Sequence, residues 1–196
     1  MIIAIEHLEK EYGLWILYEY INASKLCNGH IIYTNIRSER ISRILSRYGQ
    51  VYKERINEIY REEDLIILDP EANEALTQGD IHSNTVIVIG GILGDHPPKK
   101  RTKKLLTSRM PRAKSRNLGR KQMSIDGAAY TAYQIARGVN YDQIHYIDGL
   151  EVEGMDWEIT LPYRYPLKDG RPILSHTIRK ILEEIGLFDE YWLKTL

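Results

Sequence analysis

The sequence has little cysteine, little phenylalanine and no excess charge of either sign: it contains one Cys, one Phe, and 27 basic against 27 acidic residues. Because Cys27 is alone, an internal disulfide and a cysteine-rich zinc site are excluded, and a reducing compartment is expected. The balanced charge gives no reason to expect nucleic-acid or membrane binding. No apolar run approaches the roughly 18 residues that cross a bilayer, and no signal peptide is recognisable. We therefore expect a soluble cytoplasmic protein.

Short apolar runs alternate with segments of helical spacing, which is typical of an α/β fold. Strands are predicted at residues 1–5, 30–36, 65–69, 85–89, 113–117 and 144–148, and helices at 14–21, 39–48, 124–138 and from Ser175 to a stop at Gly186. Since the runs are continuous and rich in β-branched residues, we expect a mostly parallel sheet covered by helices on both faces. The length of 196 residues, without repeats or linkers, predicts one domain over residues 1–196.

Two segments depart from the even charge. Residues 96–125 contain eleven lysines and arginines and no acid. Such a run is a solvated face or a contact to a phosphate backbone or the ribosome, and the sequence leaves both open. The acidic segment 148–158 is a solvated loop or a pocket for a cationic acceptor.

The segment "GGILGDHPP" at 90–98 follows an apolar run directly. Glycines at the carboxyl end of a parallel strand let the backbone approach a ligand, and such ends bind small molecules in open α/β sheets. The spacing matches neither G-x-x-x-x-G-K-[ST] nor G-x-G-x-x-G, so a nucleoside triphosphate is not expected. His96 has no second histidine at zinc-binding spacing, and no metal site is predicted.

Three strand ends together carry a more specific signal: "ILDP" at 67–70, "GGILGD" at 90–95 and "RNLGRKQMSIDGAA" at 116–129. They resemble the three cofactor loops of the SPOUT methyltransferases. The chain is most similar to the archaeal and eukaryotic branch first described as predicted RNA methyltransferases, whose fungal member methylates an arginine of a small-subunit ribosomal protein. Features of that branch appear as Glu6, His7, Trp15, Glu19 and Tyr20, and as "LDP", "GGILGDHPP", "LGRKQM" with Asp126, and "PYRY".

The resemblance implies a deep trefoil knot in the cofactor region and S-adenosylmethionine bound between the three loops. The cofactor-binding residues expected from it are Leu68, Asp69, Pro70, Gly90, Gly91, Gly94, Leu118, Gly119, Gln122 and Met123. Glycines would let the backbone read the ligand, while Leu68, Leu118 and Met123 would form apolar walls. SPOUT enzymes usually dimerise through the knot, and the alanine face of 124–138 suits either a homodimer or internal packing in a monomer.

The acceptor is the open question. For an arginine of a ribosomal protein, which the branch favours, carboxylates of Glu6, Glu19 or Asp95 would hold the guanidinium. We expect Glu6 and Asp95 to converge at the carboxyl edge of the sheet. For a tRNA or rRNA acceptor, His96 or Asp95 would be the base, and Arg101 with the following lysines would hold phosphates. A ribosome-binding protein without catalysis would leave the glycine loops unexplained.

Overall fold

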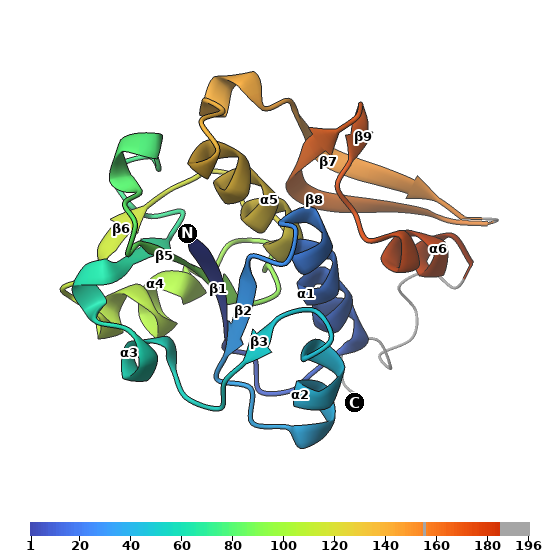
Figure 1. Cartoon of the computed structure of the whole chain (residues 1–196). Helices are drawn as coiled ribbons and strands as arrows, with labels where there is room; N and C mark the ends of the chain where they lie inside the picture. Colours follow the sequence, from blue (N-terminus) through green and yellow to red (C-terminus); the bar gives the residue numbers. More distant parts are fainter. Residues whose placement is uncertain (155, 185–196) are drawn as a thin grey trace.

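The computed structural model describes residues 1–154 and 156–184, and a six-stranded parallel sheet forms its centre (Figure 1). The strands are β1 (Ile2–His7), β2 (Ile31–Thr34), β3 (Gln50–Val51), β4 (Leu65–Leu68), β5 (Val86–Gly91) and β6 (Lys114–Arg116). Their order is β3-β2-β1-β5-β4-β6, and every neighbouring pair is parallel. The predicted parallel sheet flanked by helices is thereby confirmed. The trefoil knot stays a prediction.

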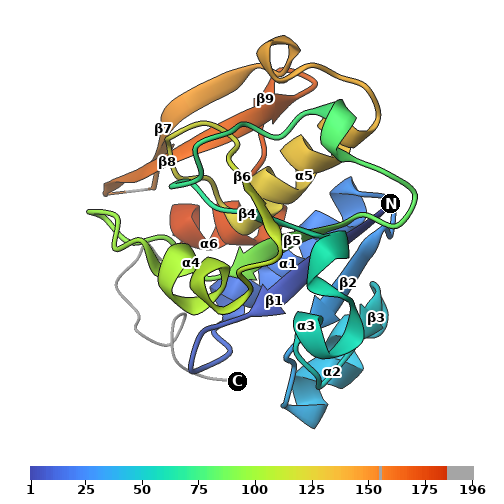
Figure 2. The same ribbon diagram turned by 90° about the vertical axis from the view of Figure 1, so that its left-hand side faces the viewer.

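Helices cover both faces of this sheet. On one face lie α1 (Leu14–Leu26) and α5 (Ile125–Ala136), and on the other lie α3 (Ile56–Ile59) and α4 (Arg101–Leu105), while α2 (Glu39–Leu45) flanks β3 (Figures 1 and 2). Side chains alternate along β1, so Ile3 and Ile5 join the core beneath α1 and α5, whereas Ala4 joins the core on the α3 side. The 3₁₀ turns Glu62–Asp64, Gln78–Asp80, Thr107–Arg109 and Tyr141–Gln143 complete the connections.

The alanine face of α5 is used inside the chain. Ala129 and Ala132 are fully buried in the same core as α1, whose Asn22 donates a hydrogen bond to Asp126 at 2.7 Å. Small side chains let the two helices approach closely. Of the two uses that the sequence left open for this face, the structure shows internal packing.

The last third of the chain forms a separate antiparallel sheet of β7 (Tyr146–Glu153), β8 (Glu158–Lys168) and β9 (Arg171–Pro172), with α6 (His176–Glu184) packed against it (Figure 1). The prediction that 144–148 is a strand of the parallel sheet was wrong. Leu150 and Val152 are buried while Asp148 and Glu151 are exposed, and this alternation belongs to a strand covered on one face only. The predicted helix stop at Gly186 lies outside the described residues.

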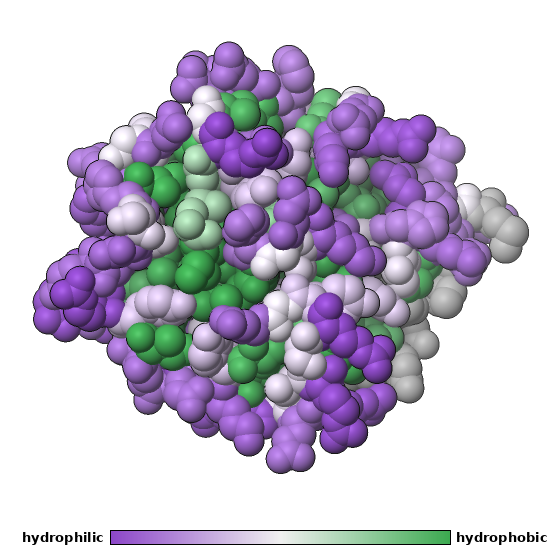
Figure 3. All heavy atoms as spheres, viewed as in Figure 1, coloured by the Kyte–Doolittle hydropathy of each residue, from purple (hydrophilic) through white to green (hydrophobic). Residues whose placement is uncertain are grey.

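The parallel strands end together at one edge of the sheet, which lies on the left in Figure 2. The segments that follow β4, β5 and β6 meet on one half of this edge, and those that follow β1, β2 and β3 meet on the other half. On the face of the molecule shown in Figure 3, hydrophobic residues form separate groups, the largest of them left of centre, and hydrophilic residues cover most of the rim. Among the described residues, no helix is long and apolar enough to cross a membrane.

Candidate active site

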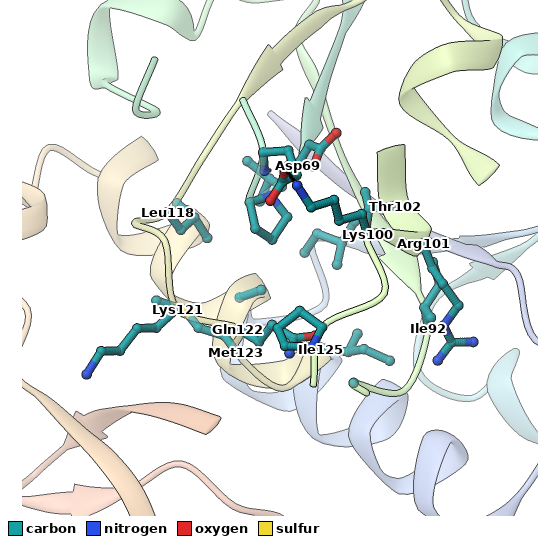
Figure 4. A pocket seen from close by; sticks show the side chains of 18 of the residues that line it. Asp69, Ile92, Lys100, Arg101, Thr102, Leu118, Lys121, Gln122, Met123 and Ile125 are labelled. Atoms are coloured by element: carbon teal, nitrogen blue, oxygen red, sulfur yellow. Dashed lines mark hydrogen bonds and ion pairs between the residues drawn. The ribbon is translucent and has the colours of Figure 1, made fainter. Parts of the chain in front are cut away.

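A cavity of about 180 Å³ lies where the segments after β4, β5 and β6 meet (Figure 4). Nine of the ten residues expected to bind the cofactor line it: Leu68, Asp69, Pro70, Gly90, Gly94, Leu118, Gly119, Gln122 and Met123. Leu118 and Ile92 face each other across the cavity, whereas the side chain of Lys121 points away from it. The walls therefore combine glycine backbone and aliphatic side chains with charged side chains of both signs.

Gly91 differs from this expectation, because it does not line the cavity. A Cβ atom at this position would collide with the hydroxyl of Tyr20 and would lie 2.9 Å from the carbonyl oxygen of Glu6. Gly91 is therefore required for packing between β5, β1 and α1. Gly119 does line the cavity, and its φ of +85° is in the left-handed region that favours glycine.

Polar contacts hold the three loops in place. The buried Asp69 carboxylate accepts hydrogen bonds from the backbone N–H of Glu71 at 2.9 Å and from the hydroxyl of Thr107 at 2.7 Å. The amide of Gln122 donates to the carbonyl oxygen of Asp95 at 2.8 Å, which ties the third loop to the second. Asp69 and Gln122 thus shape the cavity that they line.

Asp95 and Arg101 form an ion pair of 2.6 Å beside the cavity. Arg101 also contacts Glu9 at 2.9 Å, and Lys99 contacts Asp95 at 3.0 Å. Partial burial alone would raise the pKa of Asp95, but the hydrogen bonds from Lys99 and Arg101 outweigh it and the pKa is lowered. Asp95 is therefore ionised and already paired, so it holds the loop after β5 and has little capacity left for a substrate.

Glu6 does not reach the cavity, and its expected convergence with Asp95 is not found. Its side chain points to the α3 face of the sheet, where the carboxylate accepts hydrogen bonds from the hydroxyl of Thr34 and from the backbone N–H of Ile56 at 3.1 Å. Burial raises the pKa of Glu6, and these two donors lower it in part. Glu6 therefore caps the first turn of α3.

A second cavity of about 260 Å³ adjoins the first, because Ile92, Leu93, Gly94, Met123, Ser124 and Ile125 line both. Trp15 and Glu19 of α1 form one wall and residues 160–163 of β8 form another. His96 also lines it. The hydroxyl of Tyr163 donates to the carbonyl oxygen of Gly94 at 2.8 Å, which connects β8 to the loop after β5.

Among the described residues that line this second cavity, Glu19 is the only acid. It is 5% exposed, and its two carboxylate oxygens accept hydrogen bonds from the indole N–H of Trp15 at 2.7 Å and from the backbone N–H of Ile125 at 2.9 Å. Burial and the nearby Asp126 carboxylate raise the pKa of Glu19, against the lowering effect of both donors. Each oxygen keeps a lone pair, so the carboxylate can accept further donors from a cation in the cavity.

The chain is similar to known proteins over nearly its whole length. A family model described as "Protein arginine N-methyltransferase SFM1-like" matches residues 2–185. The chain belongs to the SFM1-like family. Protein arginine N-methyltransferase SFM1 of Saccharomyces cerevisiae is a relative 32% identical over 198 residues, which cover 92% of this chain and 93% of that protein.

Structures of yeast SFM1 resemble this member of the SFM1-like family over nearly its whole length. The complex of yeast SFM1 with SAM has a TM-score of 0.82 at 29% identity and covers 93% of this chain and 89% of its own. A Trm10 protein of Thermococcus kodakaraensis, 18% identical, has a TM-score of 0.56 over 72% of this chain and 95% of its own. That likeness shows a shared fold alone.

The sequence did not predict which residues meet to form the second cavity. Trp15 and Glu19 are recognisable from their family motif and Tyr163 from "PYRY", but these segments lie far apart in the chain and nothing in their spacing predicts that they meet. Within residues 1–154 and 156–184, no group of three or more His, Cys, Asp or Glu side chains could hold a metal ion.

Proposed function

We propose that the chain is a methyltransferase that uses S-adenosylmethionine to methylate an arginine side chain of a protein. The observation that carries this proposal is the acidic and aromatic cavity that shares six wall residues with the cofactor cavity. Membership of the SFM1-like family and the likeness to yeast SFM1 bound to SAM support it.

The first cavity fits S-adenosylmethionine by its chemistry. Glycine backbone at residues 90, 94 and 119 leaves main-chain groups accessible to the polar edges of the ligand, and Leu68, Leu118 and Met123 provide apolar surface. Leu68, Asp69, Pro70, Gly90, Gly94, Leu118, Gly119, Gln122 and Met123 are the residues that would hold it.

The second cavity fits a guanidinium group. A planar cation can lie against the rings of Trp15 and Tyr163 and donate to a carboxylate at the same time. Glu19 supplies that carboxylate, and the hydrogen bonds from Trp15 and Ile125 fix its orientation. Because the two cavities adjoin, an acceptor nitrogen in the second would lie beside a methyl donor in the first, which is the main requirement of an in-line transfer.

When bound, S-adenosylmethionine supplies a methyl group whose bond to sulfur breaks as a guanidine nitrogen bonds to the carbon. That nitrogen must then lose one proton. Glu19 is suited to take up the proton, because its raised pKa lies nearer to neutrality than that of an exposed carboxyl group. His96 lines the same cavity.

The resemblance to a branch that includes a ribosomal-protein methyltransferase supports a ribosomal protein as the target and the cytoplasm as the place of action. A tRNA or rRNA acceptor is less well supported. Six of the eleven cations of residues 96–125 pair with acids of the chain: Lys99, Lys100, Arg101, Arg112, Arg116 and Lys121. The run therefore offers fewer free charges to a phosphate backbone than its composition suggests.

The proposal can be tested with labelled S-adenosylmethionine and purified ribosomes. We expect label in protein, removed by protease and not by ribonuclease, with methylarginine as the labelled residue. Glu19→Gln should lower the rate about 10²–10⁴-fold and keep cofactor binding. Glu11→Gln, which neutralises an exposed acid outside both cavities, is the matched control and should retain full activity. Label in RNA, or full activity of Glu19→Gln, would contradict the proposal.

A further inference from the structure

The other half of the carboxyl edge carries a third cavity, of about 300 Å³. It lies where the segments after β1, β2 and β3 meet α4 and the turn that follows it (Figure 2). Its lining residues are His7, Leu8, Glu9, Lys10, Tyr12, Asn35, Arg37, Arg55, Leu105 and Arg109, and we call it the basic pocket. Neither the cofactor site nor the acceptor site uses any of these side chains.

The basic side chains of the basic pocket outnumber its acids. Lys10, Arg37, Arg55 and Arg109 come from four separate segments, and none of them forms a salt bridge with a carboxylate of the described chain. Glu9 is the single acid in the lining, and Arg101 holds it at 2.9 Å. Four cations outnumber Glu9 in the lining and the buried Glu6 carboxylate near Arg55, and the positive charge that remains favours an anionic ligand.

A buried donor points to the same kind of ligand. His7 is 3% exposed, its ring stacks on Tyr12 with centroids 4.1 Å apart, and its Nδ1 lies 2.9 Å from the hydroxyl of Tyr20. Its Nε2 is buried and has no hydrogen-bond partner in the described chain. Burial lowers the pKa of His7 to about 4, so the ring is neutral at pH 7. If the Tyr20 hydroxyl donates to Nδ1, the proton of the imidazole is on the buried Nε2 of a residue that lines the pocket.

Asn35 adds an unused acceptor. Its side-chain nitrogen donates to the carbonyl oxygen of His7 at 2.6 Å, which fixes the amide orientation. Its Oδ1 is then buried without a partner in the described chain. A fully deprotonated anion does not satisfy an amide oxygen, because it has no proton to donate. A ligand that carries a hydroxyl group next to its anionic group satisfies both Asn35 and the cations.

We propose that the basic pocket binds the phosphate group of a ribonucleotide, free or within an RNA chain, with the ribose hydroxyl on Asn35. Arg37 and Arg55 would contact the phosphate oxygens, and the N–H of His7 would donate to the same group. The site lies beside the methyl-transfer cavities on the same edge of the sheet, and Glu9 connects the two regions through Arg101. This proposal does not rest on the identity of the methyl acceptor.

The test uses the full-length protein and four probes: inorganic phosphate, uridine 5′-monophosphate, a short single-stranded RNA and the DNA of the same sequence. Calorimetry should detect binding of the ribonucleotide or the RNA, weaker binding of DNA, and a loss of affinity as salt rises. In ¹⁵N spectra of the imidazoles, the Nε2 signal of His7 should shift on titration. If uridine 5′-monophosphate binds, a free nucleotide is enough to fill the pocket. If the RNA binds and the mononucleotide does not, the phosphate comes from an RNA chain.

The variant Arg37→Gln with Arg55→Gln should weaken binding at least about tenfold, because each arginine donates charge-assisted hydrogen bonds. Arg40→Gln with Arg47→Gln removes the same charge from exposed positions outside the pocket and should bind as the wild type does. Binding of S-adenosylhomocysteine shows that each variant is folded. Absence of binding by the wild type, equal losses in both double variants, or no loss in the first would overturn the proposal. DNA binding as tight as RNA binding would overturn the role given to Asn35.

Discussion

Three buried titratable side chains at the carboxyl edge, Glu6, His7 and Glu19, differ in how much of their hydrogen-bonding capacity the chain itself uses. Thr34 and the first turn of α3 occupy the Glu6 carboxylate. Glu19 has one donor on each oxygen and room for more. One ring nitrogen of His7 is unpaired in the described chain. A side chain can bind a ligand only if it has hydrogen-bonding groups that the chain does not use. By this measure Glu19 and His7, which line cavities, differ from Glu6, which caps α3.

The pH dependence of the reaction should report Glu19. Its pKa is raised by burial and by Asp126, and only the ionised carboxylate attracts a guanidinium. The value of kcat/KM should therefore rise with pH as Glu19 loses its proton. The midpoint of this rise should lie at a higher pH than the pKa of an ordinary carboxyl group. Rates measured from pH 5 to 9 at constant ionic strength test this. A limb at the pKa of an ordinary exposed glutamate would contradict the assignment.

Gly91→Ala should destabilise the protein. The added Cβ meets the Tyr20 hydroxyl and the carbonyl oxygen of Glu6, and Tyr20 cannot move without losing its contact with His7. Overpacking of this kind costs about 1–3 kcal/mol, more than the 0.4–1 kcal/mol that Gly→Ala gains from the unfolded state. Urea unfolding measures the difference. Gly90→Ala is the matched comparison, since its Cβ meets the Ile92 side chain only at 3.3 Å. Equal stability of the two variants would remove the packing role of Gly91.

At the scale of the elements, α1 links the functional regions. Trp15 and Glu19 line the second cavity, Tyr20 contacts His7 of the basic pocket, and Asn22 contacts Asp126 in the first turn of α5. In the same turn of α5, the backbone N–H of Ile125 donates a hydrogen bond to Glu19. Two acids therefore share one helix N-terminus, and each influences the ionisation of the other.

Asp126→Asn should shift the ascending limb of the pH profile to lower pH. The asparagine side chain keeps an oxygen that can accept from Asn22, but the negative charge that raises the pKa of Glu19 is removed. The carboxylate of Glu19 then ionises more easily. Steady-state rates of this variant and of the wild type over the same pH range show the shift. A limb that stays in place, or that moves to higher pH, would mean that Asp126 does not act on Glu19 through its charge.

The sequence predicted the elements near the cofactor well, because continuous apolar runs and glycine loops are local signals. It predicted less where the signal is not local. The two residues of β3 are too few to show a period, and 144–148 reads as a buried strand until the alternation of Leu150 and Val152 is considered. The sequence placed Glu6 at the carboxyl edge of the sheet, where it lies. It did not show that the side chain points to the α3 face, because neighbouring strand residues point to opposite faces. The four cations of the basic pocket lie in separate segments, and only the fold brings them together.

At the scale of the whole molecule, many charges that lie in one-sign segments of the sequence form ion pairs with opposite charges from other segments. Lys121 and Arg164 both contact Asp148, so the basic run neutralises part of the acidic segment on β7. The unpaired cations of the basic pocket stand out against this background. A chain with zero formal charge can therefore carry a basic pocket and an acidic cavity at the same edge of its sheet.

We also propose that residues 1–196 unfold as one cooperative unit, although the chain has two sheets. The core of the antiparallel sheet is completed by Trp15 and Tyr18 of α1. The backbone N–H of Arg164 donates to Gln122 at 2.8 Å, which joins β8 to the third cofactor loop. A three-stranded sheet with one helix would expose this apolar face if it separated.

Scanning calorimetry should therefore show a single peak with equal calorimetric and van't Hoff enthalpies. S-adenosylhomocysteine at about 100 times its Kd should shift the whole peak upward, in line with a stabilisation of about 2.7 kcal/mol, because a ligand bound between the loops stabilises every part that unfolds with them. The side chain of Leu161 is buried in the core of the antiparallel sheet. Leu161→Ala should therefore lower the free energy of unfolding by about 2–5 kcal/mol and move the same single peak to a lower temperature. A second peak that responds to Leu161→Ala but not to the ligand would instead show that β7, β8, β9 and α6 form a separate folding unit.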